Sequence, residues 1–198
     1  MAKLPLTPAL RRDYDALFAA CTLRPRYREQ IDARVGTMIA HKPRYAALSA
    51  TCGVPWTVIA VLHELECGQS FARHLHNGDP LARATTHVPK GRPPGTPPWT
   101  WEESAADALN LTGLARWHDW SIAGTLYQLE CYNGTGYRRY HPTVPSPYLW
   151  SFSTHYTAGK YKADGQFSPT LISRQPGAAV LLHALSERGE AAFDNLGK

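Results

Sequence analysis

Apolar residues recur at intervals of three and four along much of this 198-residue chain, and this spacing predicts amphipathic helices. The first helix is expected to start at Pro8, because Thr7 is a good N-cap and proline suits the first helical position. Its apolar face comprises Leu10, Tyr14, Leu17, Phe18 and Cys21. The same pattern predicts further helices over residues 27–40, 44–50, 55–67, 101–112, 121–133 and 177–188.

Capping residues mark the boundaries of two of these helices. Thr100 and Glu103 form the capping-box pattern, and Gly113 is expected to close the helix that follows them. Asp119 is expected to cap the next helix, which Gly134 ends.

Two segments break the helical pattern. Residues 77–98 are rich in Gly and Pro and predict an extended loop or a small hairpin, whereas residues 136–167 predict a long aromatic loop. The chain has no internal repeat and no linker. It therefore predicts one mainly helical domain over residues 1–198, with a small β or loop segment around residues 77–99.

Composition adds a basic charge and an unusual set of aromatic residues. The net charge of +5 and the pI of about 9.1 favour anionic partners such as nucleic acid, a bacterial envelope or acidic lipid. The chain has 6 Trp and 10 Tyr but only 5 Phe, and aromatic residues with a polar group are common in sugar- and base-binding clefts. With 43% hydrophobic and 19% charged residues, the chain is expected to fold rather than to be disordered.

Targeting and redox signals are weak. The first 18 residues carry charges throughout and lack the apolar region of a secretory signal, and no stretch approaches the length that spans a membrane. None of the four cysteines forms a C-x-x-C pair, and a chain made in the reducing cytosol would keep them as free thiols. These cysteines are Cys21, Cys52, Cys67 and Cys131.

The segment HELEC, residues 63–67, supplies a candidate acid. With an advance of about 100° per residue, Glu66 falls between Leu62 and Ile59 inside the apolar arc of its helix, and Glu64 points away. Apolar surroundings and the negative end of a helix dipole both hold a carboxyl proton more tightly, as a general acid requires. The alternative is that Glu66 forms a buried ion pair.

HELEC also resembles the zinc pattern H-E-x-x-H, with Cys in the fifth position. His63 and Cys67 are one turn apart, both toward the outer side of the helix, and His74 and His76 could complete a ligand set. Against zinc, Cys67 at a helix end is an ordinary small apolar residue. The preferred interpretation assigns no metal and no other cofactor.

Two motifs resemble peptidoglycan hydrolases of the lysozyme superfamily, of the phage endolysin type, which are related to goose-type lysozymes and soluble lytic transglycosylases. The first is a Glu that ends an apolar helix, here Glu66, and the second is the turn YNGTGY at residues 132–137. HLHNGDPL at 74–81 and SPYLWS at 146–151 support them. The resemblance covers Val54 to Gln175, which would form the catalytic core, with residues 1–53 as N-terminal helices and 176–198 as a C-terminal helix.

This resemblance implies an α+β lysozyme-like fold, with residues 77–99 flanking the active-site cleft, and cleavage of the MurNAc-β-1,4-GlcNAc bond. Glu66 would be the general acid and Asp79 a second carboxylate that positions water, although Asp79 also suits a turn. One departure from the family is Cys67, where a Ser is usual. Without a second carboxylate the product would be a 1,6-anhydro sugar, so hydrolysis and the anhydro outcome both stay open.

Substrate contacts are expected from residues near these motifs. The turn would form the wall that packs on the acetamido sugar, and two further aromatic residues would stack on neighbouring sugars or pack in the core. Glu130 and Glu64 are minor catalytic candidates. The expected contacts are Tyr132, Asn133, Tyr137, His76, Asn77, Tyr148 and Trp150.

Other classes compete with this interpretation. They are a zinc-dependent wall peptidase that uses His63, Cys67, His74 and His76, a non-enzymatic wall-binding domain, and a nucleic-acid-binding module, for which no motif is present. The favoured expectation is a monomer that acts on peptidoglycan glycan strands, without nucleic acid or stable membrane insertion. It would be made in the cytoplasm and reach the wall after release, for example through a holin.

Overall fold

The computed structural model describes residues 4–163, 165–191 and 193, and it confirms a mainly helical chain with one small antiparallel sheet. Its contacts divide the chain into two compact units. The first unit comprises residues 1–35 and 119–198, and the second comprises residues 36–118. α2 (Arg28–Ala40) begins in the first unit and ends in the second. That the units act as one catalytic domain stays a prediction.

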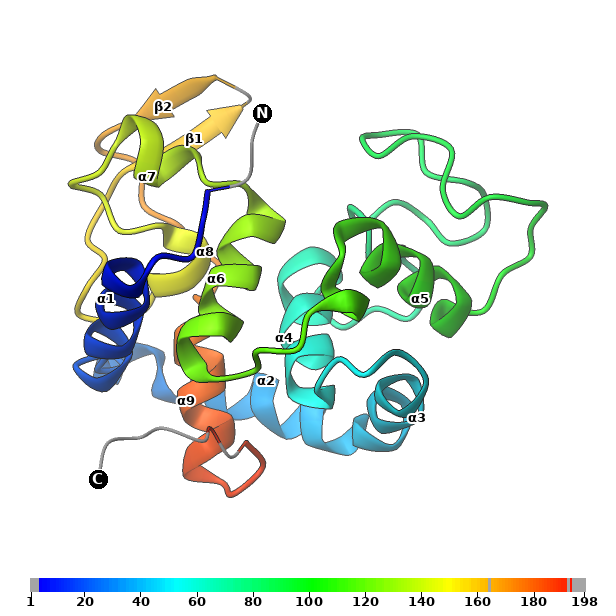
Figure 1. Ribbon diagram of the computed structural model, residues 1–198, viewed down its shortest axis with the longest axis horizontal. Helices are drawn as coiled ribbons and strands as arrows, with labels where there is room; N and C mark the ends of the chain where they lie inside the picture. The colour runs from blue at the N-terminus through cyan, green and yellow to red at the C-terminus, as the bar shows by residue number, and fades with distance from the viewer. Residues whose placement is uncertain (1–3, 164, 192, 194–198) are drawn as a thin grey trace. The chain divides into compact units, whose positions relative to one another are not determined.

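The first unit is built on α6, against which α1, α8 and α9 pack (Figure 1). Every residue of α6 from Ile122 to Glu130 is buried. Gly177 precedes α9 where an added Cβ would lie 2.3 Å from the carbonyl oxygen of Leu149, so α9 starts directly against α8. The elements are α1 (Pro8–Ala19), η1 (Pro25–Tyr27), α6 (Ile122–Asn133), α7 (Gly136–Tyr140), α8 (Pro147–Trp150), β1 (Lys160–Ala163), β2 (Gln166–Ser168) and α9 (Ala178–Glu187).

Two N-caps in this unit test the sequence predictions. Thr7 caps α1 by accepting a hydrogen bond from the Leu10 N–H at 3.2 Å, as expected. The predicted cap of α6 by Asp119 is wrong, because Ser121 accepts the bond from the Gly124 N–H. Asp119 instead accepts bonds from the Ser121 N–H and hydroxyl, and it therefore orients the residue that caps the helix.

The predicted loop over residues 136–167 is also wrong in part. It contains two short helices, α7 and α8, and the first strand of the sheet. β1 and β2 pair antiparallel, with Lys160 opposite Ser168 and Tyr161 opposite Phe167. The strands among the described residues therefore lie at residues 160–168, outside the segment around 77–99 that predicted either β structure or a loop.

The second unit packs α3 (Lys42–Cys52) against α4 (Trp56–Cys67) and α5 (Trp101–Thr112), followed by η2 (Leu114–Arg116). The capping box of Thr100 and Glu103 is present, and Gly113 ends α5 in the left-handed conformation, as predicted. The ring of His63 of α4 lies 4.4 Å from that of Trp101, the first residue of α5, and 4.7 Å from that of Phe71. An aromatic cluster thus fills the core of this unit.

The predicted loop over residues 77–98 is present, within an irregular segment from 73 to 100 that has a single isolated bridge, between Arg73 and Pro80. Prolines at 80, 89, 93, 94, 97 and 98 remove backbone donors, which explains why no regular strand forms among these residues. Among the described residues no single helix has the length and apolar character to cross a membrane, and the bent pair α3 and α4, at 115°, meets those criteria only jointly.

Candidate functional site

The last turn of α4 carries the main candidate. From Thr57 to Cys67 every residue is buried except Glu66, which is partly exposed. The helix ends when Gly68 adopts φ 56° and donates its N–H to the carbonyl of Glu64. α4 therefore holds one solvent-accessible carboxylate at the end of a buried helix.

The prediction that Glu66 faces inward and Glu64 outward is wrong. Glu64 is only 4% exposed, and its carboxylate accepts a hydrogen bond from the side-chain amide of Gln69 at 2.9 Å. The prediction assumed a helix with a solvent-facing side, whereas α4 is covered almost all round. Glu64 is therefore a buried structural carboxylate, and Glu66 is the one that solvent reaches.

The turn that follows α4 packs against the end of this helix. The Cys67 thiol donates to the carbonyl of His74 at 3.2 Å. At Gly78, where φ is 77°, a Cβ would lie 2.7 Å from the carbonyl oxygen of Glu66. Only glycine fits this position without displacing the helix end. Cys67 thus supports the backbone of the turn.

Asp79, the predicted second carboxylate, binds its own loop. It is 8% exposed, and its Oδ2 accepts from the backbone N–H groups of Thr86 at 2.7 Å and His87 at 3.0 Å. Its Oδ1 is hydrogen-bonded to His87 Nδ1 at 2.7 Å. The His87 and Thr86 backbone donors, together with the His87 ring, hold the pKa of Asp79 well below its ordinary value. The structure thus gives Asp79 the role of an ionised loop anchor.

Asn77 takes part in the same turn. Its side-chain oxygen accepts from the Asp79 N–H at 3.0 Å, and its Nδ2 donates to the carbonyl of His87 at 3.2 Å. These contacts give Asn77 a turn-stabilising role, whereas the sequence predicted a substrate contact.

The proposed zinc ligands are engaged separately. His63 is fully buried, not on an outer side as predicted, and its Nδ1 is hydrogen-bonded to the Tyr45 hydroxyl at 2.9 Å. Burial lowers the pKa of His63 to about 4, so the ring is neutral near pH 7. Cys67, also predicted on the outer side, is buried as well, at 7% exposure. Among the described residues no group of three or more His, Cys, Asp or Glu could hold a metal ion.

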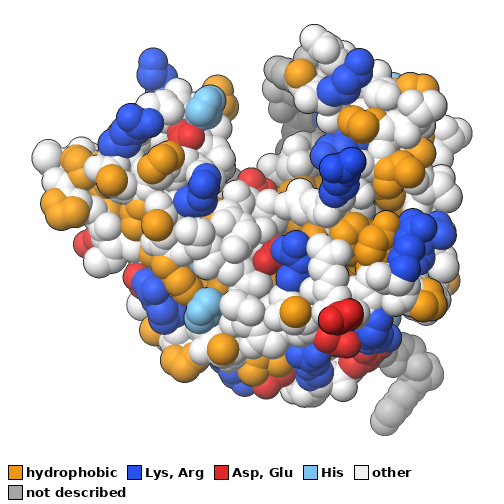
Figure 2. Space-filling view, turned by 180° about the vertical axis from the view of Figure 1, so that it is seen from behind, with side chains coloured by type: hydrophobic (Ala, Val, Ile, Leu, Met, Phe, Trp, Pro, Cys, Tyr) orange, Lys and Arg blue, Asp and Glu red, His pale blue; other side chains and the backbone are white. Residues whose placement is uncertain are grey.

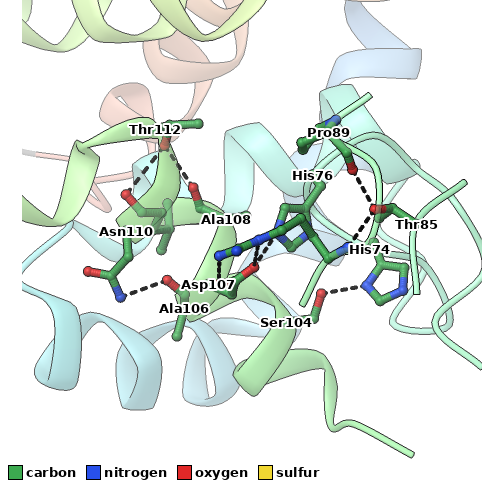
Figure 3. A network of polar contacts seen from close by, with 12 residues as sticks. His74, His76, Thr85, Pro89, Ser104, Ala106, Asp107, Ala108, Asn110 and Thr112 are labelled. Carbon is green, nitrogen blue, oxygen red and sulfur yellow. Dashed lines mark hydrogen bonds and ion pairs between the residues drawn. The ribbon is translucent and has the colours of Figure 1, made fainter. Parts of the chain in front are cut away.

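Figure 3 shows where the other two histidines point. His74 is bound between the Ser104 hydroxyl, 2.6 Å from Nδ1, and the carbonyl of Arg83, 2.7 Å from Nε2. His76 Nε2 is 2.8 Å from the Asp107 carboxylate. Arg92 also bonds Asp107 through its Nε at 2.9 Å. Both histidines therefore attach the loop to α5, and the side chain of His76 is only 1% exposed, which argues against the predicted substrate contact.

The first unit contains a pocket of about 1360 Å³. Three of the predicted sugar contacts, Asn133, Tyr137 and Tyr148, line it. The remaining lining comes from the segment after α6, from both strands and from nearby loops. These residues are Leu4, Cys131, Gly134, Thr135, Gly136, Arg139, Tyr140, His141, Pro147, Lys160, Tyr161, Lys162, Ala163, Gly165, Phe167, Ser173 and Gln175.

Two predicted contacts lie elsewhere. Trp150 is 1% exposed and belongs to the core, with its ring 5.2 Å from that of His155, so its prediction as a stacking platform is wrong. Tyr132 is half-buried and does not line the pocket. In SPYLWS the short helix α8 turns Tyr148 to the pocket and Trp150 to the interior.

Glu130 is a structural residue, not a cleft carboxylate. It is 2% exposed and accepts from Arg138 Nε at 2.6 Å and from the Tyr14 hydroxyl at 2.5 Å. Burial and the charge of Glu130 raise the pKa of Tyr14, which keeps the hydroxyl protonated as a donor. Arg138 also pairs with Asp13 at 3.0 Å, so it ties α7 to both α1 and α6.

Sequence reasoning missed the lysines and the aromatic residues of the hairpin. Lys160, Tyr161, Lys162 and Phe167 all line the pocket. The alternation of Lys, Tyr and Lys after Gly159 was the available signal for a strand. It lay inside a segment that was interpreted as loop.

No family model matches this chain, and no curated protein or solved structure is significantly similar to it. The function of this chain is therefore inferred from its own residues. They are a partly exposed carboxylate at the end of a buried helix and a pocket of tyrosines, an asparagine and cations.

Proposed function

We propose that this protein is a peptidoglycan-cleaving glycosidase in which Glu66 is the general acid. The observation that carries the proposal is that Glu66 alone keeps solvent access in the otherwise buried stretch from Thr57 to Cys67. A general acid needs both a constrained position and access to its substrate. The turn packed through Gly78 against the Glu66 carbonyl supplies the constraint.

The pocket of the first unit supports a sugar ligand. Tyr137 and Tyr148 offer aromatic surface with polar groups, and Asn133 offers both a donor and an acceptor for an acetamido group. Tyr137 is held in place, because its hydroxyl accepts from the Tyr161 N–H at 3.2 Å. The proposal thus assigns glycan binding to this pocket.

The contacts of Asp79 favour the anhydro product. A carboxylate that already accepts bonds from Thr86 and His87 has little capacity to activate a water. In the proposed reaction Glu66 protonates the glycosidic oxygen, the C–O bond breaks, and the 6-hydroxyl of the muramic sugar attacks its own anomeric carbon. The proton of that hydroxyl returns to Glu66. This is the outcome of a lytic transglycosylase.

The experiment is digestion of purified sacculi, followed by mass spectrometry of the released fragments. Wild-type protein should release muropeptides that end in 1,6-anhydro sugars. Glu66→Gln should release none while it still sediments with sacculi. The matched control is Glu187→Gln, because the Glu187 side chain is 56% exposed in a surface ion pair with Arg28.

Other outcomes would decide against the proposal. Full activity of Glu66→Gln would remove Glu66 as the acid, and peptide cleavage abolished by EDTA would favour the zinc-peptidase alternative. Sedimentation with sacculi without any fragment released by the wild type would favour a binding domain. Fragments with free reducing ends would retain the glycosidase and overturn the anhydro assignment.

A further inference from the structure

The pocket of the first unit has a marked charge as well as aromatic walls. Lys160 and Lys162 of β1 and Arg139 of α7 all line it. Among its described lining residues there is no Asp or Glu. The described part of the lining therefore carries three cationic side chains, which a neutral acetamido sugar alone does not require.

We infer that this pocket takes the acidic stem peptide that peptidoglycan carries on its muramic sugar, with Lys160, Lys162 and Arg139 contacting the peptide carboxylates. The inference rests on the proposed function and names the part of the substrate that the pocket selects.

The cations come from positions that the fold fixes. β1 is paired with β2 through Lys160 opposite Ser168, Tyr161 opposite Phe167 and Ala163 opposite Gln166, and Lys162 lies at the irregularity between Tyr161 and Ala163. Arg139 Nε donates to the Thr135 hydroxyl oxygen at 3.0 Å, which orients its guanidinium on α7. Cations held on secondary structure lose less freedom on binding than cations on a mobile loop.

The walls are packed in advance. The His141 ring stacks on Phe167 with centroids 3.6 Å apart and an interplanar angle of 15°. Tyr161 meets Tyr137 edge to face, with centroids 5.2 Å apart. The aromatic rings can pack against a sugar ring and the aliphatic parts of a peptide, and the cations can pair with the carboxylates of the peptide.

Single-stranded nucleic acid also combines stacking with cationic contacts, but it needs a basic track along its backbone. Figure 2 shows Lys and Arg side chains scattered over the face in view, several of them beside Asp or Glu, with no continuous run of them on that face. A compact acidic ligand fits this distribution better than a polyanion.

The test measures binding by the full-length Glu66→Gln protein, which should not cleave its ligands. The probes are a GlcNAc–MurNAc disaccharide that bears its tetrapeptide and the same disaccharide after removal of the peptide. We expect the peptide-bearing ligand to bind about tenfold more tightly at low salt, since exposed ion pairs each contribute only a modest factor. This preference should shrink as salt is raised.

The decisive variant adds Lys160→Gln and Lys162→Gln, and the control adds Arg83→Gln and Lys90→Gln, which remove the same charge from exposed positions of the other unit. The pocket variant should lose most of the preference, and the control should keep it. Thermal midpoints by circular dichroism show that each variant folds.

Equal affinity for the two ligands would overturn the inference, as would a preference that survives in the pocket variant or equal competition by oligodeoxythymidine. Failure of the proposed function would appear instead as no glycan cleavage by the wild-type chain. Failure of this inference alone would leave that cleavage intact.

Discussion

Gly78 lies so close to Glu66 that a Cβ at position 78 would be 2.7 Å from the Glu66 carbonyl oxygen. The contact joins the turn of residues 74–80 to the last turn of α4. The backbone position of the candidate acid therefore depends on glycine at position 78, which has no side chain.

Substitution of Gly78 by Ala should therefore reduce both stability and activity. The left-handed φ and the clash together should cost about 2–4 kcal/mol of unfolding free energy. Gly91→Ala is a matched control, because Gly91 has φ 74° but nothing within 4 Å of an added Cβ. It should cost about 1–2 kcal/mol, measured by urea unfolding, and leave sacculus digestion unchanged. Equal losses in the two variants would show that the contact with Glu66 is unimportant.

Asp79→Asn should loosen the loop without changing the type of product. The amide would present its NH₂ group to the Thr86 and His87 donors, at a cost of about 1–3 kcal/mol. Because the folded pKa of Asp79 lies below its ordinary value, the wild-type contribution is present above pH 4 and is lost as the pH falls further. Urea unfolding from pH 5 to pH 2.5 should show this loss in the wild type and a smaller loss in the variant. A switch of products toward free reducing ends would instead indicate a role in chemistry.

His63 should make the second unit less stable below pH 6.5. Its folded pKa is about 4 because of burial, whereas the unfolded ring titrates near 6.5, so between these values the unfolded state binds more protons. Stability should fall by about 2–3 kcal/mol from pH 7 to pH 4.5. An NMR titration of the His63 ring gives an independent reading. A midpoint near 6.5 would contradict the buried neutral ring.

Glu130→Gln should lower the free energy of unfolding rather than abolish the activity. It leaves Arg138 without its closest buried carboxylate, which should cost about 3 kcal/mol, whereas Glu187→Gln at an exposed pair should cost less than about 1 kcal/mol. Unfolding curves give these values. Well below the melting temperature, Glu130→Gln should digest sacculi at nearly the wild-type rate, and loss of turnover in the fully folded variant would restore Glu130 as a catalytic candidate.

Substitutions of Trp150 and Tyr148, both on α8, should distinguish a role in packing from a role in binding. Trp150→Ala should cost about 3–5 kcal/mol, because the side chain is 1% exposed. Tyr148→Ala should cost about 1 kcal/mol but weaken binding of the peptide-free disaccharide, because Tyr148 lines the pocket. Unfolding curves and calorimetry measure the two effects, and the reverse pattern would exchange the roles.

Local signals in the sequence predicted several helix ends, although Ser121 and not Asp119 caps α6. The capping box at Thr100 and the stops at Gly113 and Gly134 depend on residues within one turn, so spacing alone is sufficient. The orientation of Glu64 and Glu66 was not predictable in this way, because α4 is surrounded by other segments and its burial is decided by tertiary packing.

The site was predicted only in part for the same reason. Asn133, Tyr137 and Tyr148 line the pocket, but spacing cannot tell an exposed tyrosine from the buried Trp150 two residues later. Glu130 became a candidate because its partners, Tyr14 and Arg138, are 116 and 8 positions away, and no local pattern reveals such a pairing.

The carboxylates of Asp79 and Asp107 hold the loop of residues 77–98 at two positions and leave the segment between those positions exposed. Asp79 binds residue 87 and Asp107 binds residue 92, while the side chain of Val88 between these anchors is 88% exposed. A fluorophore or affinity tag attached at residues 88–90 would therefore report on the protein while leaving the end of α4 undisturbed. The same tip is where sequence drift among relatives should be tolerated most.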